Sequence, residues 1–119
     1  MDERPRVRVT KAIGSCVVAA TPIIIHQLTT GRTAKLVKLM WYNGQAADVI
    51  LEIGSYAAGP PAALTRRLPR IKAIAGQHDG LSELECPEFE FEGDIGAQAS
   101  AAGAGAAAVE VQATVEEVG

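Results

Sequence analysis

The sequence predicts an all-β protein, a single antiparallel β-sandwich of the jelly-roll or Greek-key type with about eight short strands. Short β-branched runs alternate with polar residues, turn-forming residues separate the runs at intervals of about eight to twelve residues, and no segment has the period of a long helix. The chain has 119 residues, 48% of them hydrophobic, so it can build one core. Residues 1–119 are expected to form one domain.

The amino-terminal quarter predicts three short strands. Arg6 to Thr10 alternates arginine and threonine with Val7 and Val9, which favours a half-buried strand with the valines inside. Cys16 to Ala20 is a second valine-rich run. Ile23 to Leu28 opens with three isoleucines, a composition typical of a strand buried on both faces.

Ala34 to Ile53 carries the strongest local signal, two β-rich runs around Asn43-Gly44. This dipeptide suits a type I′ turn, so the segment predicts a β-hairpin. Both faces of its first arm are apolar, which places that arm in the middle of a sheet. The two faces are Leu36, Lys38, Met40 and Tyr42 on one side, and Lys35, Val37, Leu39 and Trp41 on the other.

The middle of the chain alternates loops and short elements. Gly54 to Pro61 is expected to be a loop because it ends in two prolines, and Ala62 to Leu68 could form one helical turn. Arg70 to Ala75 alternates as a strand with a basic face. Gln77 to Gly80 has the composition of a turn.

The remaining third is acidic and again alternates. Residues 83–92 place glutamates opposite apolar residues, with a kink or a sheet edge at Pro87. A short strand to about Ala101 and a glycine turn are expected next. Ala108 to Val118 then alternates valine and alanine with polar residues without interruption, which makes it the clearest strand in the chain.

Charge is divided along the chain. All 11 Lys and Arg lie in residues 1–72, with four acids, while residues 73–119 hold ten acids and no base, so the two parts carry +7 and −10 within a net charge of −3. Such a division favours contacts between oppositely charged strands or subunits. Nucleic acid is disfavoured because aromatic residues make up only 4% of the chain and scarcely interleave with basic ones.

No pattern predicts catalysis, a metal or a cofactor. Cys16, Cys86, His26 and His78 are not paired at the close spacing of a zinc site, and we expect two buried thiols, although a disulfide stays open. Residues 103–108 formally match G-x-G-x-x-A, but a strand follows where the dinucleotide fingerprint needs a helix. A cupin-like metalloenzyme would need both histidines and an acid to converge.

The segments that carry a resemblance to a known family are G-R-T-A-K-L-V-K-L, E-F-E-F-E-G-D-I and the V-E-V-Q-A-T-V-E-E-V end. In its strand pattern the chain resembles small β-sandwich proteins of tailed-phage virions, such as head-decoration or capsid-stabilising subunits. The resemblance implies a multimer, commonly a trimer, seated on a larger protein shell, and it assigns no individual residue.

From these observations we expect a non-enzymatic structural or interaction subunit that self-associates. The basic cluster after residue 65 should meet the acidic strand of the same or a neighbouring subunit, and the isoleucine run should add apolar contact. The subunit-contact candidates are Arg66, Arg67, Arg70, Glu88, Glu90, Glu92, Ile23 and Ile25.

An alternative is a small carbohydrate- or peptide-binding module. Its site would be the Gly54 to Arg67 loop, with Trp41, Tyr42 and Tyr56 as contacts. No apolar run is long enough for a membrane-spanning helix, and the start of the chain reads as a strand where a signal peptide would have an apolar core. The compartment stays open between virion and cytoplasm.

Overall fold

A computed structural model describes residues 7–59, 61–66, 68–82 and 89–119. These residues form ten strands and one short 3₁₀ turn, η1. The elements are β1 (Val7–Cys16), β2 (Ile23–His26), β3 (Thr33–Asn43), β4 (Val49–Ala57), β5 (Ala63–Arg66), β6 (Ile71–Ala73), β7 (His78–Leu81), β8 (Phe89–Phe91), β9 (Ile95–Ala99), η1 (Gly105–Ala107) and β10 (Val109–Val118).

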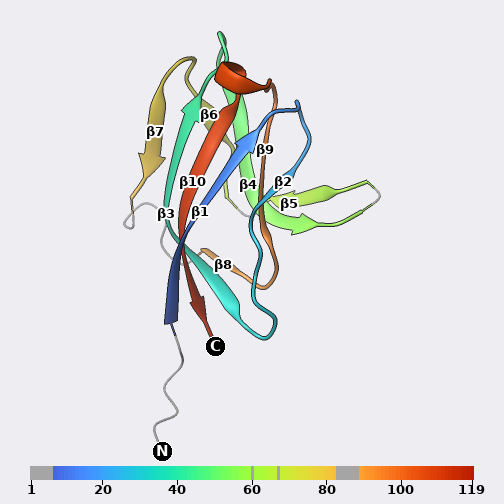
Figure 1. The fold of residues 1–119 in the computed structure, drawn as a ribbon, viewed down its shortest axis with the longest axis vertical. Helices are drawn as coiled ribbons and strands as arrows, with labels where there is room; N and C mark the ends of the chain where they lie inside the picture. Colours follow the sequence, from blue (N-terminus) through green and yellow to red (C-terminus); the bar gives the residue numbers. More distant parts are fainter. Residues whose placement is uncertain (1–6, 60, 67, 83–88) are drawn as a thin grey trace, which may run out of the picture.

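The strands form two antiparallel sheets that pack face to face (Figure 1). The first sheet has the order β1-β10-β3-β7, with β8 also paired to β3, and the second has the order β2-β9-β4-β5, with β6 paired to β4. The predicted all-β sandwich is confirmed. Within the described ranges there is no helix long and apolar enough to cross a membrane.

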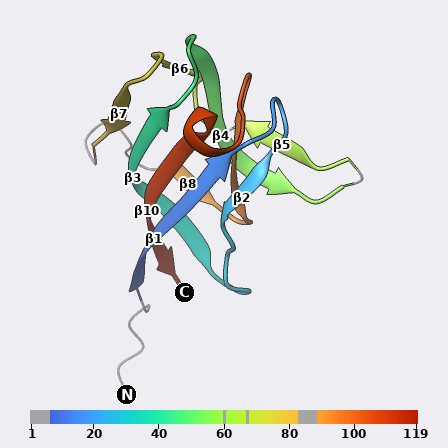
Figure 2. The same cartoon turned by 45° about the horizontal axis from the view of Figure 1, so that its top comes forward.

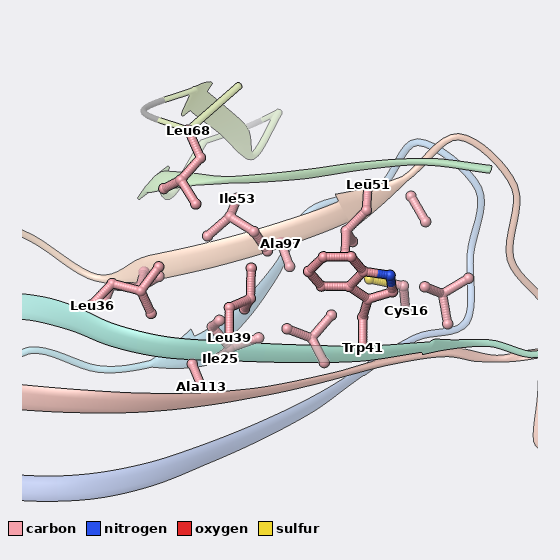
Figure 3. Packing of buried hydrophobic residues seen from close by; sticks show 14 of the residues in the cluster. Cys16, Ile25, Leu36, Leu39, Trp41, Leu51, Ile53, Leu68, Ala97 and Ala113 are labelled. Carbon is pink, nitrogen blue, oxygen red and sulfur yellow. The ribbon is translucent and has the colours of Figure 1, made fainter. Parts of the chain in front are cut away.

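The core lies between the two sheets (Figure 3). Leu36, Leu39 and Trp41 point from the first sheet toward Leu51 and Ile53 of the second, and all five are buried. Small residues such as Ala97 and Ala113 fill the remaining positions and let the sheets approach. Interdigitating inner faces of this kind are what stabilises a sandwich.

Strand β10 confirms the clearest prediction from the sequence. Its inward residues are all buried, and it is paired along its whole length with β1 on one side and β3 on the other. Glu117 continues the inward series after Val115, so a carboxylate lies inside the sandwich at the end of the strand.

The predicted hairpin around Asn43-Gly44 is wrong. Strands β3 and β4 exist, but they belong to different sheets and do not pair with each other. Gly44 does not have the positive φ that a type I′ turn requires. Its N–H donates to the Ala108 carbonyl at 3.0 Å, and a Cβ at Gly44 would lie 2.1 Å from the Ala106 carbonyl oxygen, so the glycine permits the chain to pass close to η1. Figure 2 shows η1 at this end of the first sheet.

Along strand β3 the alternation of inward and outward side chains is interrupted once. The register with β10 shifts between Thr114 and Val115, where Val37 is an extra residue. This bulge turns Leu36 inward together with Leu39 and Trp41, although Leu36 was predicted to lie on the face opposite to Leu39 and Trp41. Lys38, Met40 and Tyr42 point outward.

Strand β1 is a single strand of ten residues, and the predicted separate strand at Cys16 to Ala20 is wrong, since the chain turns there. The predicted facing is also reversed, because Val9 is 61% exposed. The inner face is built from small residues. A Cβ on Gly14 would lie 2.6 Å from Cγ2 of Ile25, so a larger side chain on β1 would displace β2.

Further local predictions need correction. Strand β4 continues through Ala57 into the expected loop, and β5 replaces the expected helical turn because it pairs with β4. The expected turn at Gln77 to Gly80 contains β7, which pairs with β3. The expected strand near Ala97 to Ala101 begins earlier, at Ile95. Pro87 and most of the acidic strand lie outside the described residues.

Candidate functional site

The outer face of the first sheet carries four exposed large apolar side chains, which we call the apolar strip: Val9, Ile13, Met40 and Tyr42. Their exposed fractions are 61%, 71%, 40% and 40%. Single exposed apolar residues need no explanation, but several on one face of one sheet indicate a contact surface.

Residues that are paired between neighbouring strands lie in rows across the sheet. Ile13 and Met40 lie on either side of Gln112, and Tyr42 lies beside Glu110 in the next row. Directly paired residues on one face have Cβ atoms about 5 Å apart, so Ile13 and Met40 each lie in reach of Gln112, and Tyr42 lies in reach of Glu110.

Two shallow grooves adjoin Met40. The first, of about 320 Å³, is lined by residues that include Ile13, Tyr42, His78 and Gln112, and the second, of about 260 Å³, runs along β7 past Gly80. The outer face of the first sheet therefore has depressions into which apolar side chains of a partner could insert.

A second notable group is buried between the sheets. His26 ends β2 in the second sheet and Glu117 lies on β10 in the first, and His26 Nε2 is 2.6 Å from Glu117 Oε2. A carboxylate can only accept, so the imidazole N–H donates. The backbone N–H of Thr29 also donates to Oε2, at 3.4 Å. Arg32 Nη1 is 3.9 Å from Oε1, which is buried and has no hydrogen-bond partner in the described structure.

The surroundings of Glu117 shift its ionisation. Burial raises the pKa of its carboxyl, but hydrogen bonds from Thr29 and His26 together outweigh burial, and the resulting pKa lies below the usual value. The cluster joins the two sheets, and His26 and Glu117 at its centre are buried, so we expect it to contribute to stability.

We expect acid to remove this contribution. A pKa lowered by folding means that the carboxylate's contribution is fully present above its unfolded pKa, about 4.3. The contribution is lost as the pH falls through the folded pKa. Urea unfolding of wild type and Glu117→Gln between neutral pH and pH 3 would measure it. The difference between the two should shrink as the pH falls, and a constant difference would contradict the expectation.

The structure scatters the residues predicted as subunit contacts. Ile25 is 6% exposed and packs in the core, which leaves it no free surface, and Ile23 packs against the core. Arg70, just before β6, has its Nε 3.2 Å from Oε1 of Glu52 on β4, so the partner that the described residues give it lies outside the acidic segment. Glu90 and Glu92 are exposed, on and just after β8. The side chains of Arg66, Arg67 and Glu88 lie outside the described residues.

The aromatic site of the alternative prediction does not assemble. Trp41 is a core residue, Tyr42 lies on the outer face of the first sheet, and Tyr56 lies on β4 in the second sheet. His26 and His78 lie in different sheets. In the described part of the chain no three His, Cys, Asp or Glu side chains are placed to hold a metal ion. Cys16 is a buried free thiol, and burial raises its pKa to about 11.

The sequence did not indicate that Val9 and Ile13 lie on the surface. It did carry a signal for Met40 and Tyr42, the other two residues of the apolar strip. Both faces of β3 are apolar, which is more apolar surface than one core can use. Only the bulge at Val37 determines which residues of β3 remain outside, and the bulge has no sequence signature of its own.

No protein-family model and no curated protein matches this chain. Among solved structures, it is similar to a chain from Bacillus endospore appendages, described as a novel family of disulfide-linked pili. The sequence identity is 14% and the TM-score is 0.47, over 99% of this chain and 90% of the other. At that TM-score the similarity supports no conclusion about function, and the resemblance to phage decoration subunits stays a prediction.

Proposed function

We propose that this chain is a structural subunit that self-associates through the outer face of its first sheet. The apolar strip carries this proposal, because it exposes four large apolar side chains on one face of one sheet. Self-association would remove them from water, at about 25 cal/mol for each Å² of apolar surface buried. The predicted trimer and the larger protein shell belong to this proposal as its finer form.

The proposed role involves no catalytic or ligand-binding chemistry. The two grooves are shallow and their lining is mostly apolar, and the buried His26 and Glu117 pair lines neither of them. The predicted carbohydrate- or peptide-binding role has less support, because the three aromatic residues it needs lie apart.

A double substitution, Ile13→Glu with Met40→Glu, should abolish self-association. It places two charges in the middle of the proposed contact, where burial without a partner is costly. Sedimentation velocity across a concentration series would measure the loss. Ile50→Glu is the matched control, because Ile50 is 38% exposed on β4 in the other sheet and should tolerate the same change.

The control variant also identifies which of the two sheets carries the contact. If Ile50→Glu dissociated the protein and the double variant did not, the contact would lie on the second sheet. If wild-type protein were monomeric at every concentration, the proposed function would be overturned.

A further inference from the structure

Charges on the outer face of the first sheet follow a pattern around Gln112. Along β10, Glu110 lies two residues before Gln112 and Thr114 two residues after it, each about 7 Å away along the strand. Thr114 is paired with Lys11 of β1 on one side and Lys38 of β3 on the other. In the rows directly adjacent to the Ile13, Gln112 and Met40 row, Glu110 therefore lies on one side and Lys11 and Lys38 lie on the other.

None of these three charged groups has an ion-pair partner among the described residues. Glu110, Lys11 and Lys38 are exposed. Their charges remain available to a partner.

We propose that two copies stack through this face, related by a two-fold axis that crosses the strands at Gln112. This inference rests on the self-association proposed above and gives it a two-fold geometry in place of the predicted trimer. The rotation keeps each strand over its own counterpart and reverses the direction along the strands. Each Glu110 then lies over Thr114 of the second copy, between Lys11 and Lys38 of that copy.

The same rotation pairs the apolar groups. Ile13 meets Ile13 and Met40 meets Met40 of the second copy, which buries the centre of the strip. Tyr42 lies over Lys38 of the second copy, where an ammonium above an aromatic ring is favourable. A self-complementary patch of this kind is what a two-fold contact requires.

The size of the face sets the expected strength. Four strands at about 4.8 Å spacing and about eight residues at about 3.3 Å each give a face of about 500 Å² per copy. The total of about 1,000 Å² is at the lower limit for a specific interface, so we expect a weak, concentration-dependent dimer. With a subunit of 12.4 kDa, a dimer has a mass of about 25 kDa and the predicted trimer about 37 kDa.

A charge exchange tests the geometry. Glu110→Lys alone puts three lysines together at each contact, and Lys11→Glu with Lys38→Glu puts three glutamates there, so each variant should be at least tenfold weaker as a homodimer. Mixed in equal amounts, the two variants should form a heterodimer, because every lysine again meets a glutamate. Native mass spectrometry distinguishes the three dimers by mass, and wild type is the reference.

The outcomes separate this inference from the proposed function. A heterodimer that forms while both homodimers are lost supports the two-fold stacking. If Ile13→Glu with Met40→Glu abolishes association but mixing restores nothing, the self-association stands and the stacking geometry is overturned. A trimeric wild type overturns the two-fold geometry, and a monomeric wild type overturns both proposals.

Discussion

Replacing Glu117 with alanine should lower the free energy of unfolding by about 3 kcal/mol, because its carboxylate accepts two hydrogen bonds and each bond to a charged group contributes about 1.5 to 3 kcal/mol. Glu117 is 2% exposed and His26 is 9% exposed, so water cannot replace the lost bond without entering the sandwich. The substitution also removes the acceptor for the Thr29 N–H and the only acid within 4 Å of Arg32 in the described chain. Urea unfolding at neutral pH would measure the change.

Glu116→Ala is the matched control for this prediction. Glu116 is the neighbouring residue, half-buried on the outer face of the same strand, and its loss should cost less than about 0.5 kcal/mol. A double-mutant cycle with His26→Ala isolates the coupling between the two side chains. A coupling near zero, or equal effects of Glu116→Ala and Glu117→Ala, would show that the buried pair does not hold the sheets together.

The sequence predicted a strand well where the alternation of apolar and polar residues in that strand matches its buried and exposed faces. Strand β10 could be predicted almost to its bounds, because every second residue is apolar and the strand lies in the middle of its sheet. The same alternation misled at β1, where the apolar residues Val9 and Ile13 face outward. The inner face there must be small because β2 packs against it, and that neighbour is not visible in the local sequence.

Pairing partners were the least predictable feature. Asn43-Gly44 is the strongest local turn signal, yet β3 finds its partners in β10, β7 and β8, all distant in the sequence. Long-range pairing overrode the local preference because β3 can be buried on both edges only in the middle of a sheet. The candidate surface depends on the same long-range pairing, because Ile13 and Met40 are brought to one face only by the pairing of β1 and β3 with β10.

Two buried polar side chains tie the sheets together, one at each end of the β3–β10 ladder. Asn43 is paired with Val109 at one end, and Glu117 is paired with Ala34 at the other. The Asn43 side-chain amide donates to the carbonyl of Ala73, which ends β6 in the second sheet, as the Glu117 carboxylate accepts from His26 of β2. Between these ends the core is apolar, so each polar tie fixes the relative position of the sheets where apolar packing alone could slide.

Replacing Asn43 with alanine should therefore cost about 3 kcal/mol of unfolding free energy, at about 1 kcal/mol for each of three lost hydrogen bonds. The amide nitrogen donates to the carbonyls of Ala47 at 3.0 Å and Ala73 at 2.9 Å, and the side-chain oxygen accepts from the Gln45 N–H at 2.8 Å. Thermal and urea unfolding would measure the loss. Gln77→Ala is the control, since the exposed Gln77 contacts Asn43 through its backbone, which alanine retains.

Asn43→Asp separates the structural role from the turn preference. Aspartate serves almost as well as asparagine in a turn before glycine, so a residue retained only for its turn chemistry would tolerate the change. Here aspartate would keep the bond from Gln45 but place a carboxylate against two carbonyl oxygens, one of them buried. We expect Asn43→Asp to destabilise the protein at least as much as Asn43→Ala at neutral pH. Wild-type stability in the aspartate variant would mean that the tie to Ala73 contributes nothing, and that the sheets are held at this end by apolar packing alone.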